Sequence, residues 1–79
     1  MKPKDFEIGK PYKTTARVDA CLEGNDGDCD FTNQVNLEPE TRLVYDGQGI
    51  DKETLRFHSE SGGIEYHLHY NDLADITAA

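Results

Sequence analysis

Hydrophobic and polar residues alternate along much of this chain with a period of two. From Tyr12 to Leu22 the even positions are apolar or small, and Lys13, Arg17 and Asp19 stand between them at odd positions. Side chains two apart in an extended strand point to the same side of a sheet, so this pattern predicts a half-buried strand over residues 12–22.

Similar alternation predicts four more short strands. Their apolar positions are Phe31, Val35 and Leu37, then Leu43 to Tyr45, then Leu55 and Phe57, and lastly Ile64, Tyr66, Leu68 and Tyr70. Gly, Asn, Asp and Pro gather between these segments and favour turns. After the last strand, residues 71–76 are predicted to form one helical turn with Asn71 as its N-cap.

The last hairpin is the best-defined part of the pattern. The apolar faces of its two strands coincide only if paired residue numbers sum to an odd value, which selects a two-residue turn at Ser61-Gly62 or at Gly62-Gly63. Gly62-Gly63 suits positive backbone angles, and this preferred register places His58 opposite His67.

These elements predict an all-β fold. The 79 residues suffice for one small domain spanning positions 1–79. Five short strands and a late helical turn favour a small closed or nearly closed barrel. An OB-type barrel or an open antiparallel sheet is the alternative.

Two segments look like parts of a known fold. Residues 37–45 (LEPETRLVY) are similar to the turn and strand that open the central sheet of SH3-like domains, and residues 66–73 (YHLHYNDL) are similar to their last strand and its one-turn helix. On these segments the chain resembles the SH3-like small β-barrels, which implies a five-stranded barrel. The aromatic groove with which signalling SH3 domains bind proline-rich peptides is not matched, and the chain has no Trp.

Charge adds a polarity to this fold. The net charge is -8, yet residues 1–17 carry a balance of +3 and residues 18–79 a balance of -11. So acidic a body disfavours direct binding to nucleic acid or to an anionic membrane. We expect instead a basic protein surface as the partner, bound by five acidic residues: Asp19, Glu23, Asp26, Asp28 and Asp30.

A more specific form of this hypothesis is that the acidic face imitates nucleic-acid phosphate, as small inhibitors from phages and other mobile elements do. An exposed edge strand could also pair two copies of the chain. Enzymatic activity is not expected, because the sequence has no phosphate-binding glycine loop and no nucleophile elbow.

The alternative class is a metal- or pH-responsive protein. His67 and His69 share one face of their strand, and the preferred register brings His58 to them. Imidazoles suit Zn²⁺ or Ni²⁺ and titrate near neutral pH, so the cluster predicts a metal site or a proton-sensitive surface. A solvated polar strand face is the other interpretation, and no other cofactor is indicated.

The acidic loop between the first two predicted strands raises the possibility of a calcium site and of a disulfide. Residues 22–33 do not fit an EF-hand calcium loop, although a different calcium loop or a solvated hairpin tip would fit. Cys21 and Cys29 flank this loop, and their separation allows either a disulfide or two reduced thiols. The sequence shows no secretory signal and no membrane-spanning run, so a cytoplasmic location is expected.

Overall fold

The computed structural model describes residues 1–23, 29–50 and 52–79, with side chains for all of these except 29–33. Seven antiparallel strands form one sheet in the order β3-β2-β6-β5-β4-β1-β7. The strands are β1 (Pro11–Thr14), β2 (Val18–Glu23), β3 (Cys29–Leu37), β4 (Arg42–Gln48), β5 (Thr54–Ser59), β6 (Glu65–His69) and β7 (Ile76–Ala78). Two 3-10 helices complete the elements, η1 (Pro3–Asp5) and η2 (Tyr70–Asp75). The predicted all-β class is confirmed.

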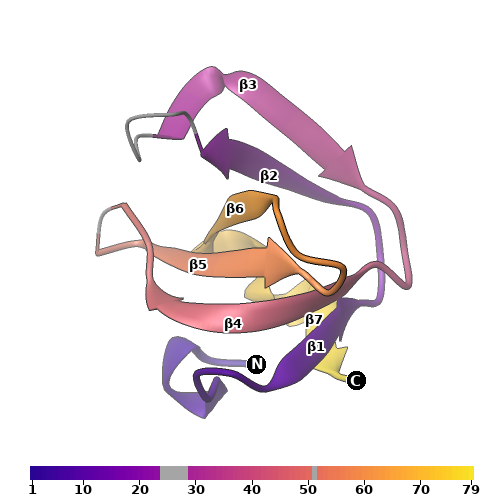
Figure 1. Ribbon diagram of the computed structural model, residues 1–79. Helices are drawn as coiled ribbons and strands as arrows, with labels where there is room; N and C mark the ends of the chain where they lie inside the picture. The colour runs from indigo at the N-terminus through magenta and orange to yellow at the C-terminus, as the bar shows by residue number, and fades with distance from the viewer. Residues whose placement is uncertain (24–28, 51) are drawn as a thin grey trace.

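The sheet curls without closing. Figure 1 shows β2 and β3 at one end, β5 and β4 in the middle, and β1 and β7 at the other end beside both termini. Among the described residues no ladder joins the two edge strands, β3 and β7. The architecture is therefore the open antiparallel sheet that the sequence left as an alternative, with seven strands where five were predicted.

The extra strands have identifiable origins. The predicted strand over residues 12–22 is interrupted at 15–17, so that β1 pairs with β4 and β7, whereas β2 pairs with β3 and β6. At the break the Thr15 amide donates to the Asp75 carbonyl at 2.7 Å. The last predicted helical residue, Ile76, instead opens β7. The continuous apolar alternation over residues 12–22 is thus divided between two strands, β1 and β2, which lie in different regions of the sheet.

The core lies on the predicted inner face. Tyr12, Val18 and Ala20 are buried, whereas Asp19 is exposed, as the alternation requires. Phe57 is fully buried, with ring centroids 5.5 Å from Phe6 and 5.3 Å from Tyr45. Phe6 belongs to the N-terminal segment beside β1 and β4, so this segment is part of the core.

The β5–β6 hairpin differs from the preferred register. Arg56 pairs with His67 and His58 pairs with Glu65, so the predicted His58–His67 pairing is wrong. The adopted register is the one that the alternative turn at Ser61-Gly62 predicts, although the loop is wider and spans residues 60–63: the Ser59 amide donates to the Ile64 carbonyl at 2.9 Å. Alternation cannot distinguish two registers that differ by two residues, because both keep the apolar faces together.

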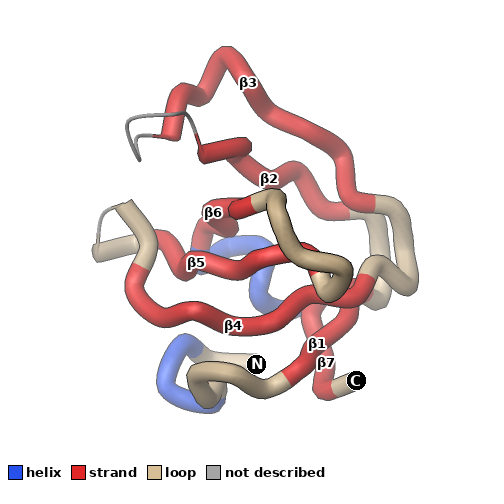
Figure 2. The backbone as a smooth tube through the Cα atoms, in the orientation of Figure 1, coloured by secondary structure: helices blue, strands red, loops and turns tan. Residues whose placement is uncertain are grey.

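The helical turn is where the sequence placed it, with a different cap. η2 covers Tyr70–Asp75 behind the sheet (Figure 2) and buries Leu73. Its N-cap is His69 and not the predicted Asn71: His69 Nδ1 accepts a hydrogen bond from the Asn71 amide at 3.1 Å. No helix in the described ranges is long and apolar enough to cross a membrane.

Candidate functional site

The three histidines take separate partners. His58 Nδ1 lies 2.7 Å from Asp46 Oδ2, His67 Nε2 lies 3.1 Å from a Glu23 oxygen, and His69 Nε2 lies 3.4 Å from Glu53 Oε2. The predicted meeting of three imidazoles depended on the register that the hairpin does not adopt. Among the described residues, the one group of side chains that could hold a metal contains His58 alone of the three.

His67 belongs to an internal polar network. Its Nδ1 accepts from the Ile50 amide at 3.2 Å, so the ring proton resides on Nε2 and points to Glu23. Glu23 also accepts from both Arg56 nitrogens that face it, Nε at 3.0 Å and Nη2 at 3.1 Å. This network ties β2, β5 and β6 to the loop that follows β4.

The network fixes the charge state of Glu23. Hydrogen bonds from Arg56 lower the pKa of this carboxyl, burial raises it, and the hydrogen bond from His67 lowers it further. The net direction is downward, so Glu23 is a carboxylate already held by a cation. A residue expected on the partner-binding face therefore serves inside the fold.

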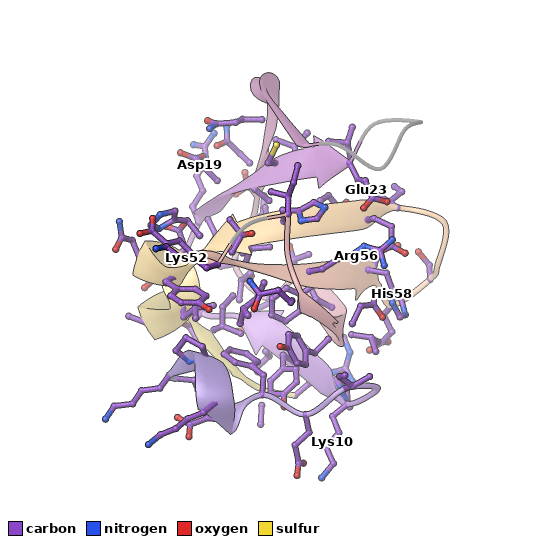
Figure 3. All side chains as sticks on the ribbon, turned by 90° about the vertical axis from the view of Figure 1, so that its left-hand side faces the viewer. Lys10, Asp19, Glu23, Lys52, Arg56 and His58 are labelled. Atoms are coloured by element: carbon purple, nitrogen blue, oxygen red, sulfur yellow. The ribbon has the colours of Figure 1, made fainter. Side chains whose placement is uncertain are left out.

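The other predicted acidic residues are only partly described. Asp19 is exposed on β2, and Figure 3 shows it at the opposite end of that strand from Glu23. Asp26 and Asp28 lie outside the described residues, and for Asp30 only the backbone is described. Their joint role as a partner-binding loop stays a prediction.

Asp19 instead borders an acidic concavity. The concavity has a volume of about 170 Å³, and its polar lining consists of Asp19, Gln34, Thr54, His67, His69 and Asp72. His67 and His69 thus border one recess, in agreement with their predicted shared strand face. Burial raises the pKa of Asp72; the neighbouring carboxylates Asp19 and Asp75 raise it further, and His69 opposes them. The carboxylates therefore repel one another in a partly desolvated recess, which favours a positively charged group among them.

Sequence reasoning missed Asp72 as a member of this site. In the sequence it lies within the predicted helical turn of residues 71–76, 53 positions after Asp19. The two residues approach because β2 pairs with β6 and η2 directly follows β6. No local pattern indicates that proximity; it depends on the order of strands in the sheet.

Cys21 lines the same concavity and is buried. It is disulfide-bonded, which excludes the reduced alternative for this residue. The backbone of Cys29 pairs with Glu23 across β2 and β3, and the side chain of Cys29 lies outside the described residues. Structural disulfides are typical of oxidising compartments and rare in the cytosol, so this bond does not support the expected cytoplasmic location, which stays a prediction.

Comparisons with protein-family models, curated proteins and solved structures found no match. The likeness to SH3-like barrels accordingly remains a resemblance of sequence pattern. Two features of the described residues carry chemistry: the acidic concavity beside η2 and the side chains around His58.

Proposed function

We propose that this chain is a non-enzymatic binding module whose acidic face receives a cationic side chain of a basic protein. The observation that carries the proposal is the concavity between Asp19 and Asp72. It joins two carboxylates that are distant in sequence with polar groups that can orient a lysine ammonium or an arginine guanidinium.

The pairing of charges elsewhere supports this choice. Five basic residues of the chain are already paired with acids: Lys10 with Glu7, Lys13 with Glu40, Arg17 with Glu38, Arg42 with Glu60 and Arg56 with Glu23. Among the residues described, Asp19, Asp72 and Asp75 have no Lys or Arg nitrogen within 4.0 Å. Among the described residues, these three acids lie near one another beside η2, where a partner can use their charge.

A titration followed by NMR tests the proposal. The probe is a short lysine- and arginine-rich peptide added to ¹⁵N-labelled protein at low salt. We expect amide shifts centred on Asp19, Gln34 and Asp72, with apparent affinity falling steeply as NaCl rises. The Asp19→Asn/Asp72→Asn variant should lose at least tenfold in affinity.

The matched control is Glu38→Gln/Glu40→Gln, which makes the same change in net charge on two exposed acids that already have basic partners. It should bind the peptide within about twofold of the unmodified chain, because neither acid lines the concavity. Shifts spread evenly over the surface, or equal losses in the two variants, would show net charge alone and overturn the proposal.

The more specific form, in which a mobile-element inhibitor mimics nucleic-acid phosphate, makes a separate prediction. A DNA-binding protein captured by this chain should be released by duplex DNA, since both would occupy the same basic surface. Capture that duplex DNA leaves unchanged would reject the mimic and leave the acidic concavity as a general cation-recognising site.

A further inference from the structure

Asp46, His58 and Glu65 converge from three adjacent strands at a distance from the acidic concavity. Asp46 lies on β4, His58 on β5 and Glu65 on β6, and His58 and Glu65 are directly paired. One ligating atom from each side chain lies within 4.8 Å of the other two. Figure 3 shows His58 and Arg56 on the same side of the molecule, with Asp19 away from them.

A β-bulge directs Asp46 into this group. The β4–β5 ladder shifts register between Tyr45 and Gly47, which leaves Asp46 as the extra residue. Bulges re-aim side chains and are common beside functional sites. Here the carboxylate turns to the imidazole, and both its oxygens lie within 2.8 Å of His58 Nδ1.

Glu65 supplies the second observation that points to a ligand. Its Oε2 atom is buried and has no hydrogen-bond partner. The nearby cation, Arg56, has its Nε 3.6 Å away, which is within ion-pair range but beyond hydrogen-bond distance, and that Nε donates to Glu23 instead. A buried acceptor without a donor is unfavourable, and a second carboxylate close by makes it more so. A bound cation would relieve both.

We propose that Asp46, His58 and Glu65 form a binding site for a divalent transition-metal ion of the Zn²⁺ type. One imidazole and two carboxylates are ligands that Zn²⁺ accepts, and they leave a fourth position for water or for a partner's side chain. The imidazole favours such an ion over Ca²⁺, which prefers oxygen ligands. The three side chains are each partly exposed, so an ion can enter from solvent.

The bound ion would act as a cross-link between β4, β5 and β6. Ligands in a tetrahedral Zn²⁺ site lie roughly 3–3.5 Å apart, so loading would separate Asp46 slightly from the His58 nitrogen that it now contacts and draw Glu65 toward both. The site is independent of the acidic concavity, because the two share no residue. Either site can therefore fail its test without affecting the other.

Thermal unfolding with and without metal tests the site. Protein freed of metal with EDTA and then given ZnCl₂ should bind one ion per chain in calorimetry. Its Tm should rise by about 10–20 °C at a hundredfold excess over Kd. Each of His58→Gln, Asp46→Asn and Glu65→Gln should reduce affinity at least tenfold, and CaCl₂ should give no comparable rise.

The matched control is His69→Gln, which removes a more exposed imidazole outside the group. This variant should keep the full Zn²⁺-dependent rise in Tm. A second readout covers any variant that folds poorly: Co²⁺ added to the unmodified chain should give visible absorption bands that Zn²⁺ abolishes. Absence of saturable Zn²⁺ binding, or binding lost in His69→Gln and kept in the other three variants, would overturn the proposal.

Discussion

At the scale of single residues, Glu23 shows that the role of a charged side chain depends on its place in the fold. In the sequence it is one of several acids beside a turn, and in the fold it accepts hydrogen bonds from Arg56 and His67. Its side chain is only 16% exposed, so the carboxylate has lost much of its water and depends on these donors. Stability at neutral pH should therefore depend on Glu23 more than on any surface acid.

The Glu23→Gln variant tests this dependence. The amide keeps the shape but removes the charge that faces Arg56, and we expect a loss of about 1–3 kcal/mol in the free energy of unfolding at pH 7. Because the fold lowers the pKa of this carboxyl, its contribution is present above the ordinary value of 4.5 and is lost as pH falls through the lower value of the folded state.

Urea denaturation at several pH values measures the effect. The difference between Glu23→Gln and the unmodified chain should shrink as pH falls below 4.5. Glu38→Gln is the control, since its pair with Arg17 is long and exposed, and it should change stability by less than about 0.5 kcal/mol. Equal losses in the two variants at pH 7 would contradict the assigned role of Glu23.

At the scale of elements, two glycines in turns are required for different reasons. A Cβ added at Gly49 would overlap the Thr54 side chain and lie 2.8 Å from the Thr54 carbonyl carbon, at the point where β4 gives way to β5. Gly63 has open space around it, but its φ of +86° is one that other residues rarely adopt.

Alanine at these two positions should therefore have unequal effects. Gly63→Ala should cost about 1 kcal/mol through its backbone alone. Gly49→Ala must displace a buried strand residue, and we expect a loss of about 2–3 kcal/mol or more. Urea denaturation measures both, and a smaller effect at Gly49 than at Gly63 would contradict the close packing described for the β4–β5 turn.

The elements also show how far the sequence could predict the fold. Alternation located Val18, Ala20, Leu37 and Leu43 on the buried face, because burial of one face is what imposes a period of two. The same period does not reveal where a strand breaks, so it predicts continuous strand through residues 15–17. It also does not reveal a slip of two residues, so it allows the pairing of His58 with His67 where the fold pairs His58 with Glu65.

The candidate sites were less predictable than the strands for the same reason. Asp46, His58 and Glu65 meet through a bulge and a hairpin register, and Asp19 meets Asp72 through the order of strands. Each group of side chains comes together only through strand pairing between residues far apart in the sequence. The sequence indicates which chemical groups are present, namely imidazoles on strands and a surplus of acid. It does not indicate which partner each group contacts in the fold.

At the scale of the whole molecule, charge is arranged in two ways. Ion pairs on the surface join residues far apart in the chain, such as Lys13 with Glu40 and Arg42 with Glu60. Among the described residues, acids that lack such partners, such as Asp19 and Asp72, repel one another and contribute to the net charge of -8. Long-range repulsion is screened by salt more readily than a close pair is.

Salt should therefore stabilise this protein while it weakens partner binding. Raising NaCl from about 10 to 150 mM shortens the Debye length from roughly 30 to 8 Å, and we expect Tm to rise by about 2–5 °C. At low salt, Asp19→Asn/Asp72→Asn should raise Tm, because it removes repelling acids. Glu38→Gln/Glu40→Gln makes the same change in net charge but removes acids with basic partners, so it should leave Tm unchanged or lower it. A fall in Tm with added salt, or an equal rise in both variants, would show that the position of the acids does not matter.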